Sequence, residues 1–212
     1  MEEMTIHWEA AAPGVRKVYE NLSKALADSR FYLAGGTALA LQEGHRISVD
    51  LDLFAPTIGQ PEALVRRLTT GGMEIEVVST AQETLYVQAE GVQISFIGSP
   101  FPWLAPPVRP APGLLPLASA EDLAAMKLAA VASRGNRKDF VDLWVLITRR
   151  KPLQEYLDGF RAKYGARDIG HVVRSLVFFD DADSEPPLRL LAPIRWAQVK
   201  KDFRRWVGRL MQ

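Results

Sequence analysis

Apolar and polar residues follow two different periods along the chain, and the change of period divides it into two parts. Before residue 100, apolar residues at helical spacing are interspersed with short apolar runs that alternate with polar positions, as in half-buried strands. The pattern predicts helices over 14–29, 37–43 and 61–70, strands over 31–34 and 49–54, and an antiparallel meander over 73–79, 84–89 and 92–97. The first part therefore combines a sheet with helices.

Beyond residue 118 the pattern is helical throughout. Ser119 begins a capping-box signature, and apolar residues then recur at helical spacing. Helices are expected over 119–133, 136–150, 152–164, 169–179 and 193–212. The last helix carries an apolar stripe formed by Trp196, Val199, Phe203, Trp206 and Leu210. These helices are expected to pack as a small bundle.

Prolines separate the two parts. Seven of the 14 prolines fall between residues 100 and 116. Proline has no amide hydrogen and a fixed φ angle, so neither a helix nor a central strand can run through this stretch. We therefore predict an α/β domain over 1–99, a proline-rich linker over 100–117 and a helical domain over 118–212.

Composition removes several kinds of chemistry. The chain has no cysteine, which excludes disulfides, zinc–thiolate centres and thiol nucleophiles. Residues 1–12 carry three glutamates and no Lys or Arg, unlike a secretory signal. No apolar run approaches the ~20 residues that a membrane span needs. A cytoplasmic protein without a membrane partner is therefore expected.

The charge is distributed unevenly between the two parts. Residues 1–118 contain 8 Lys and Arg against 13 Asp and Glu, whereas residues 119–212 contain 18 against 12. The net charges are therefore −5 and +6. The second part is either a surface suited to a polyanion or a chance clustering of solvated charges.

Candidate chemistry is concentrated around the first two predicted strands. In the second strand, Asp50 and Asp52 are two positions apart and project from the same side. Two such carboxylates repel each other unless a cation neutralises them, and a hard divalent ion such as Mg²⁺ takes oxygen ligands. Between the strands, Gly35 and Gly36 allow backbone N–H groups to approach a phosphate at a helix start, and Thr37 adds a hydroxyl. Together these features indicate metal-assisted phosphoryl transfer.

The order of these features resembles the AbiEii/AbiGii nucleotidyltransferase toxins, which belong to the DNA polymerase β-like superfamily. The resemblance rests on Tyr32-Leu-Ala-Gly-Gly-Thr-Ala-Leu-Ala-Leu41 and on His45-Arg46-x-Ser48-x-Asp50-Leu-Asp52-Leu-Phe54. It continues with Glu121-Asp-Leu-Ala-Ala-Met-Lys127 and with Arg137-Lys138-Asp139-Phe-Val-Asp142-Leu. It covers roughly residues 30–150.

The resemblance implies an α+β fold, in which a nucleotidyltransferase domain of mixed β-sheet and flanking helices precedes a helical bundle. It also implies Mg²⁺-dependent transfer of a nucleotide from an NTP, in relatives to RNA and notably to the 3′ end of tRNA. Such a toxin is often paired with an antitoxin. The expected partners are therefore an NTP, RNA and an antitoxin protein.

The resemblance assigns roles to residues of the first part. Nucleotide binding falls to Gly35, Gly36, Thr37, Arg46 and Ser48, and catalysis with metal binding falls to Asp50 and Asp52. The residue itself leaves two roles open for Arg46, because its planar guanidinium either clamps a phosphate or base or pairs with a carboxylate.

In the second part the resemblance makes Lys127 and Asp139 catalytic residues, with Lys127 contacting the nucleotide phosphates across a cleft from Gly35 and Gly36. Lys127 lies at the edge of the predicted buried face of its helix, so its ammonium either reaches solvent or points into the cleft. Asp139 is about a quarter-turn from the apolar stripe of its helix, whereas Asp142 lies nearly opposite that stripe. The alternative for Asp139 is a carboxylate that stabilises the helix start.

One position departs from the superfamily pattern. Ser95 stands on a later predicted strand, where a third carboxylate is usual. A hydroxyl is a weak Mg²⁺ ligand and a poor general base. Three functions therefore stay open: transfer to RNA as a toxin, transfer to a protein or small molecule, and nucleotide binding without catalysis.

Overall fold

The computed structural model describes residues 5–210, and within this range the chain divides into two compact units. The first unit comprises the residues up to 101 and residues 106–118, and the second comprises residues 102–105 and the residues from 119 onward. Each unit has its own buried apolar residues. None of the helices within 5–210 has the length and apolar character needed to cross a membrane.

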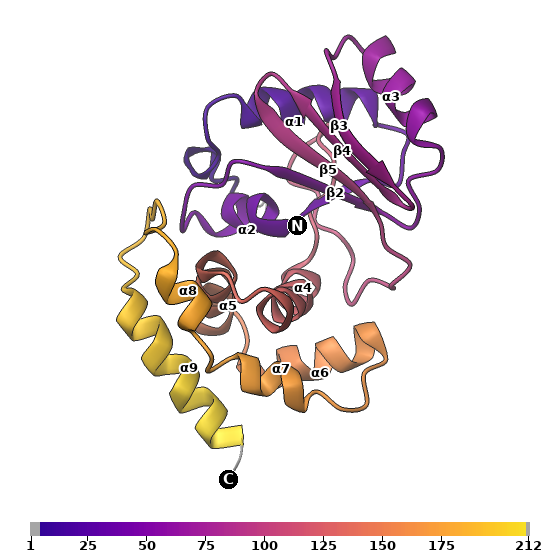
Figure 1. Cartoon of the computed structure of the whole chain (residues 1–212). Helices are drawn as coiled ribbons and strands as arrows, with labels where there is room; N and C mark the ends of the chain where they lie inside the picture. Colours follow the sequence, from indigo (N-terminus) through magenta and orange to yellow (C-terminus); the bar gives the residue numbers. More distant parts are fainter. Residues whose placement is uncertain (1–4, 211–212) are drawn as a thin grey trace. The chain divides into compact units, whose positions relative to one another are not determined.

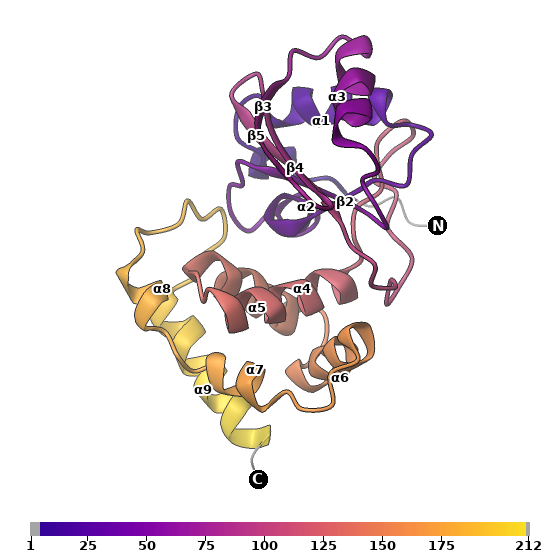
Figure 2. The same ribbon diagram turned by 45° about the vertical axis from the view of Figure 1, so that its right-hand side comes forward.

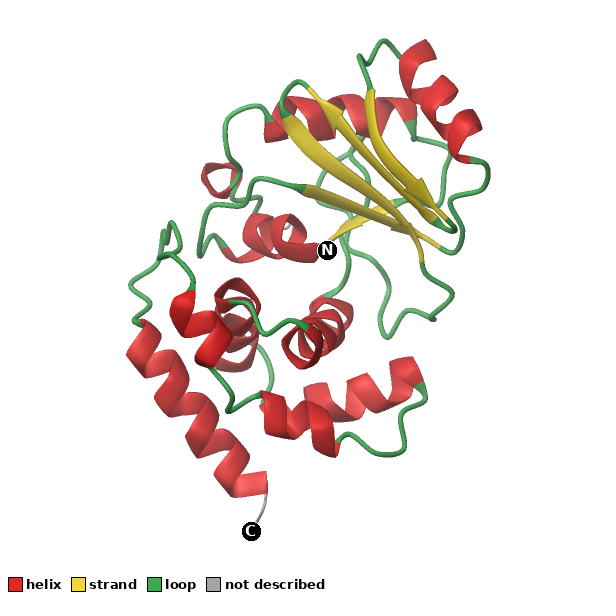
Figure 3. Cartoon of the chain, in the orientation of Figure 1, coloured by secondary structure: helices red, strands yellow, loops and turns green. Residues whose placement is uncertain are grey.

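The first unit is a five-stranded sheet with helices (Figures 1 and 3). Its elements in chain order are η1 (Trp8–Ala10), α1 (Val15–Ala25), β1 (Tyr32–Ala34), α2 (Gly35–Glu43), β2 (Leu51–Ala55), α3 (Pro61–Thr70), β3 (Glu76–Ala81), β4 (Thr84–Ala89) and β5 (Val92–Gly98). The strand order is β1-β2-β5-β4-β3, in which β2 and β5 run parallel and the other neighbours run antiparallel. This mixed sheet, followed in the chain by helices alone, confirms the predicted α+β class.

One face of the sheet is buried, and α1 and α3 lie on the same side of it (Figure 2). Alternate residues of the strands point to this face, so that Leu51 and Leu53 of β2 are fully buried. Leu22 of α1 and Leu68 of α3 are equally inaccessible, and removing these side chains from water drives the packing. The intervening residues of β2, including Asp52, keep partial exposure.

Strand register fixes what lies next to Asp52. The antiparallel pairing of β1 places Ala34 opposite Asp52, and the parallel pairing of β5 places Ser95 beside it. Because α2 begins directly after Ala34, the start of this helix is also held next to Asp52. Residues from three elements therefore meet at one point of the sheet.

Some boundaries in the first unit differ from the sequence prediction. The helix α2 begins at Gly35, so the glycine pair forms its first turn rather than a loop before it. The strand β2 begins at Leu51, which leaves Asp50 just outside, because the hydroxyl of Thr37 bonds the Asp50 carbonyl in place of a strand partner. The edge strand β3 begins at Glu76, three residues later than predicted, and is exposed along its length.

The second unit is helical. Its elements are α4 (Ala120–Ser133), α5 (Arg137–Arg149), α6 (Leu153–Tyr164), α7 (Gly170–Ser175), α8 (Asp180–Ser184) and α9 (Trp196–Leu210). The predicted cap of α4 is present, because the Asp122 amide donates to the Ser119 hydroxyl at 3.0 Å. The single helix predicted over 169–179 ends at Ser175 instead, and the chain then bends so that Leu176 and Phe179 both reach the core.

The buried stripe of α9 is shifted from the predicted one. Its buried residues are Val199, Asp202, Phe203 and Val207. Trp196, Trp206 and Leu210 are only partly covered. A carboxylate can occupy this face because the indole N–H of Trp144 donates to Asp202 at 3.0 Å.

The proline-rich segment is shared between the units instead of forming a separate linker. Its residues 102–105 belong to the second unit, where the carboxylate of Asp122 accepts a hydrogen bond from the Leu104 amide at 3.1 Å. The same carboxylate pairs with Lys163 at 2.7 Å, and Lys163 donates to the Pro102 carbonyl at 2.9 Å. Buried polar groups thus fix this short stretch to the helices.

The rest of the segment pairs with the first unit. The amide of Leu33 in β1 donates to the Pro116 carbonyl, and the Ala118 amide donates to the Leu33 carbonyl, both at 2.8 Å. The hydroxyl of Tyr19 on α1 also donates to the Leu115 carbonyl at 2.6 Å. The segment covers the free edge of β1 because backbone groups at a sheet edge need partners.

Candidate active site

The first residue of α2 lies against Asp52. Gly35 has a φ of +63°, a left-handed conformation that glycine adopts without steric cost. A side-chain carbon added there would overlap the Asp52 carboxylate oxygen Oδ2. The N-cap residue Ala34 makes no side-chain cap, so the first-turn amides and the positive end of the helix dipole lie beside this carboxylate without a competing side chain from the cap.

The second residue of α2 lies against two polar side chains. A Cβ atom on Gly36 would come within 2.5 Å of Arg46 Nη2 and within 3.3 Å of Ser48 Oγ. Arg46 is 4% exposed, and its Nη1 donates to the Ile47 carbonyl at 3.2 Å. A buried guanidinium beside the first turn of α2 adds to the positive potential at that turn.

Thr37 ties the turn to the segment that carries Asp50. Its hydroxyl lies 2.9 Å from the Ser48 hydroxyl and donates to the Asp50 carbonyl. The only hydroxyl proton of Thr37 goes to the Asp50 carbonyl, because a carbonyl can only accept a hydrogen bond. The Ser48 hydroxyl therefore donates its proton to the Thr37 oxygen. Thr37 is 1% exposed, so its hydroxyl is buried in these contacts. The two hydroxyls hold the backbone of Asp50 against α2.

Asp50 and Asp52 flank the buried Leu51, and both are partly exposed. This alternation is the one expected for two residues on the same face. Ser95, in register beside Asp52, is also partly exposed. Among residues 5–210, no three His, Asp or Glu side chains are grouped as metal ligands. A carboxylate pair fits Mg²⁺, which completes its coordination with water and substrate phosphates.

Lys127 and Asp139 meet inside the second unit. The Nζ atom of Lys127 lies 2.9 Å from Asp139 Oδ1 and 2.6 Å from Asp142 Oδ2. Both carboxylates are 0% exposed, and Lys127 is 4% exposed. Arg134 donates two further hydrogen bonds to Asp139, at 2.8 and 3.0 Å. The cluster therefore contains two cations and two carboxylates.

The surroundings of Asp139 control its protonation. Burial alone would raise the pKa of this carboxyl group, because it disfavours the charged form. The charge of Lys127 and the hydrogen bonds from Arg134 and Lys127 outweigh burial and hold the pKa of Asp139 below its usual value. Asp139 is therefore ionised at neutral pH.

The prediction for Asp142 was wrong. It was placed nearly opposite the apolar stripe of α5, yet it is fully buried and paired with Lys127. The reason is that α5 packs against α4, α8 and α9, so that most of its circumference is covered. Asp139 and Asp142 are three residues apart on one helix face, and this spacing could have predicted that they share a partner.

Arg134 was missed altogether by the sequence interpretation. It is the C-cap residue of α4, and its bonds to Asp139 depend on how the α4–α5 turn folds. Lys127 and Asp139 lie in the second unit, whereas Gly35, Asp50 and Asp52 lie in the first. Their predicted meeting in one site stays a prediction.

Comparison with known proteins adds independent findings. A family model described as "Nucleotidyl transferase AbiEii toxin, Type IV TA system" matches residues 16–212. An uncharacterized protein of Aquifex aeolicus is 33% identical over 184 residues, which cover 86% of this chain and 88% of that protein.

Solved structures also resemble the chain. A putative nucleotidyltransferase from H. pylori gives a TM-score of 0.59 at 16% sequence identity, covering 99% of this chain and 95% of that one. The antibiotic-resistance factor ANT(2'')-Ia gives a TM-score of 0.51 at 16% identity, covering 72% of this chain and 91% of that one. At this identity the two structures show a shared fold only.

The family match extends over nearly the whole chain and includes the glycine turn, the carboxylate pair and the buried ion cluster of the second unit. It confirms the family that the sequence motifs predicted. The chain therefore belongs to the AbiEii nucleotidyltransferase toxin family and is a nucleotidyltransferase.

Proposed function

We propose that this nucleotidyltransferase uses Mg²⁺ and an NTP to add a nucleotide to RNA, at the 3′ end of a tRNA, and that it is the toxin of a toxin–antitoxin pair. The contact between Gly35 and Asp52 carries the proposal, because it joins a phosphate-binding turn to the carboxylate pair. Membership of a toxin family supports the toxin role and an antitoxin partner.

The proposed reaction is an in-line transfer. The RNA 3′ hydroxyl attacks the α-phosphorus of the NTP, the bond from that phosphorus to the bridging oxygen breaks, pyrophosphate leaves, and the hydroxyl proton passes to water. The first-turn amides of α2, at Gly35 and Gly36, bind the phosphates, and Arg46 strengthens the positive potential there. Asp50 and Asp52 would hold Mg²⁺, which when bound would offset the charge of the phosphates.

The remaining residues position these groups. Thr37 and Ser48 keep the backbone of Asp50 in place through their hydroxyl bonds. From the second unit, we propose that Lys127 contacts the NTP phosphates and that Asp139 keeps the lysine charged and oriented. The short contacts of Lys127 with Asp139 and Asp142 support its orientation by these carboxylates, since they fix the ammonium group in one position.

A transfer assay with NTPs labelled at the α-phosphate and purified tRNA tests the proposal. Asp50→Asn and Asp52→Asn should each lower the transfer rate by at least ~10²-fold, because each removes a charge that the reaction needs. Glu76→Gln is the matched control, since Glu76 is an exposed carboxylate on the edge strand of the same unit. Chelation of divalent ions should stop transfer, and Mg²⁺ should restore it. Undiminished transfer by either aspartate variant contradicts the proposed metal site.

The location of the label distinguishes the acceptors. Label at the 3′ end of tRNA supports the proposal. Label in a protein or in a small molecule would show that this molecule, and not RNA, is the acceptor. Thermal melts without metal provide a structural control. Asp50→Asn should melt at or slightly above the wild-type temperature, because removing one of two like charges relieves repulsion. Asp52→Asn also loses the attraction of its carboxylate to the start of α2, so it should melt slightly below Asp50→Asn.

A further inference from the structure

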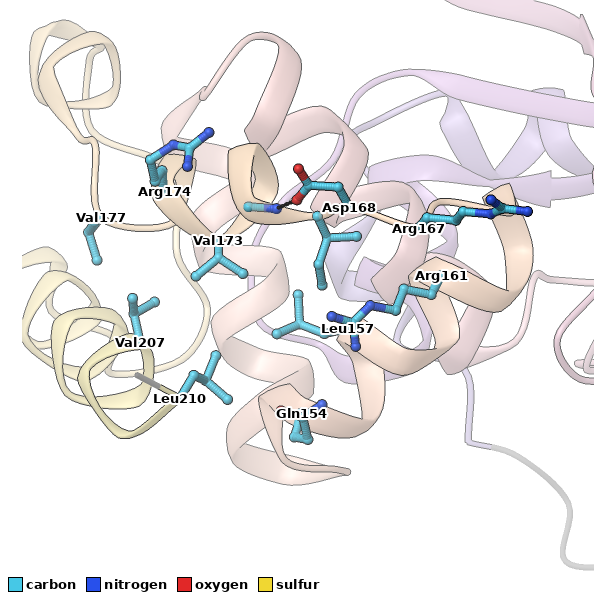
Figure 4. Close-up of a pocket in the computed structure, with 12 residues that line it drawn as sticks. Gln154, Leu157, Arg161, Arg167, Asp168, Val173, Arg174, Val177, Val207 and Leu210 are labelled. Carbon is cyan, nitrogen blue, oxygen red and sulfur yellow. Dashed lines mark hydrogen bonds between the residues drawn. The ribbon is translucent and has the colours of Figure 1, made fainter. Parts of the chain in front are cut away.

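The second unit contains a pocket that the proposed reaction does not use. It lies between α6, α7 and α9 and has a volume of about 460 Å³ (Figure 4). Its floor is aliphatic and is formed by Leu157, Ile169, Val173, Val177, Val207 and Leu210. Its remaining lining includes three arginines and one aspartate, namely Arg161, Arg167, Arg174 and Asp168. An apolar floor with a few polar groups and this size is typical of a site for a small ligand or ligand fragment.

The arginines differ in how they face the pocket. Arg161 carries its guanidinium over Leu157, whereas Arg167 and Arg174 extend from the rim away from the aliphatic floor (Figure 4). Arg161 also pairs with Asp158 at 3.1 Å, but both side chains are about half exposed. Such an exposed pair contributes little, so a ligand phosphate can replace the carboxylate.

Asp168 offsets only one of these three positive charges. Its carboxylate accepts a hydrogen bond from the Gly170 amide at 2.7 Å and so stabilises the turn before α7. With three arginines and one aspartate in the lining, the net charge is positive. The pocket therefore selects a ligand that joins an anionic group to a flat or apolar body.

We infer that this pocket binds a nucleoside monophosphate unit, with its phosphate on Arg161, its base on the aliphatic floor, and Arg174 adding positive potential at the rim. Arginine suits this role because its planar fork pairs with phosphate oxygens and its face stacks on bases. Single-stranded RNA offers such units, since its bases are free to splay into pockets. The net charge of +6 over residues 119–212 favours the same polyanion. The choice of RNA over a free nucleotide rests on the proposed function.

Binding to a fluorescent single-stranded RNA 12-mer, measured by anisotropy over a range of salt concentrations, tests the inference without requiring transfer. The double variant Arg161→Gln/Arg174→Gln should bind about 10-fold more weakly than wild type, and its salt slope should be smaller by about 0.7, because one phosphate contact is lost. The control Arg189→Gln/Arg195→Gln removes the same charge from exposed arginines of the same unit outside the pocket. The RNA affinity of this control should fall by less than about 2-fold.

A third variant tests the floor. Val177→Glu places a carboxylate in the pocket at a position that is already 37% exposed, so the fold should tolerate it. It should weaken RNA binding as strongly as the double arginine variant. The inference would be overturned if both double arginine variants lost the same RNA affinity, or if the pocket variant lost none. Full RNA binding by Val177→Glu would also overturn it. Thermal melts confirm that every variant is folded.

Competition with AMP distinguishes the two sources of the ligand. If RNA binds far more tightly than AMP, the pocket holds one unit of a longer strand. If AMP binds as tightly as RNA and loses its affinity in the same variants, the pocket is a site for a free nucleotide. Repeating the RNA titration with Asp52→Asn separates this inference from the proposed reaction, because RNA binding should persist where transfer is lost.

Discussion

Gly35 and Asp52 constrain each other at the candidate active site. The left-handed backbone of Gly35 brings α2 so close to the strand β2 that no side chain fits between them. A similar constraint holds in the second unit, where Lys127 is enclosed by two fully buried carboxylates.

Gly35→Ala should therefore abolish nucleotide transfer as well as lower stability. An L-residue in this conformation costs about 1–2 kcal/mol, and the new methyl group must also displace the Asp52 carboxylate. The matched control is Gly165→Ala, since Gly165 has a φ of +62° and nothing within 4 Å of an added Cβ. Urea unfolding should show a cost of about 1–2 kcal/mol for the control without loss of transfer. Full nucleotide transfer by Gly35→Ala would contradict the assignment of Asp52 to the active site.

Asp139→Asn should destabilise the protein by about 3–5 kcal/mol at pH 7, because it leaves the buried Lys127 with one carboxylate fewer. The control Glu20→Gln breaks the exposed pair of Glu20 with Arg16 and should cost less than about 1 kcal/mol. Chemical denaturation of both variants measures the difference. Costs of similar size would show that the buried cluster contributes no more than a surface pair.

The contribution of Asp139 should also depend on pH. Since the pKa of Asp139 is lowered in the folded protein, the stability it provides is present above the unfolded carboxyl pKa of about 3.9 and is lost as the pH falls toward the folded value. The gap in unfolding free energy between wild type and Asp139→Asn should therefore be constant from pH 7 to about pH 5 and shrink below pH 4. A gap that grows on acidification would contradict the ion pairing.

Helices of the second unit begin in two different ways, and this difference affects their stability. At α4 the Ser119 hydroxyl accepts from the Asp122 amide at 3.0 Å and donates to the Asp122 carboxylate at 2.6 Å. At α5 the N-cap residue Asn136 makes no side-chain cap bond, although its residue type favours one. Residue type alone thus identifies a helix start without showing whether the cap is formed.

Ser119→Ala should cost about 1–2 kcal/mol of unfolding free energy, because the first turn of α4 loses its acceptor. Asn136→Ala is the control in the same unit and should change stability by a few tenths of a kcal/mol. Urea denaturation followed by circular dichroism compares the two. Equal costs would indicate that Asn136 caps α5 in solution.

The chain passes from the first unit to the second twice, into residues 102–105 and again at Ser119, and it returns once in between, at residue 106. The first passage depends on a pair that is distant in sequence, Asp122 with Lys163, both nearly inaccessible. Lys163 also holds the Pro102 carbonyl at 2.9 Å. One buried ion pair therefore stabilises both the helical unit and the path of the chain into it.

Lys163→Met should destabilise the protein by about 3–5 kcal/mol, because it leaves the Asp122 carboxylate buried without its charge partner. It should also speed proteolytic cleavage within residues 100–106. Lys151→Met removes an exposed lysine that pairs with Glu121, and it should cost less than about 1 kcal/mol and leave cleavage unchanged. An unchanged rate of proteolysis in Lys163→Met would show that the ion pair does not hold residues 102–105 in place.

Local sequence patterns were sufficient to predict the fold class and the candidate chemistry. Strand and helix periods are local properties, so the antiparallel meander and the helical second part followed from apolar spacing. The glycine pair and the Asp50–Asp52 spacing are likewise local, because neighbouring residues on one turn or strand have fixed relative directions. These motifs were sufficient to predict the family.

Which distant groups meet depends instead on how the elements pack in three dimensions. The pairing of Asp122 with Lys163, the burial of Asp142 against Lys127 and the arginine-lined pocket depend on helices that pack on several sides of one another. The first residue of β2 is Leu51, because the hydroxyl of Thr37, from another element, bonds the Asp50 carbonyl. Periodicity along one helix shows which of its faces is apolar, whereas the partners that cover its other faces come from elsewhere in the chain.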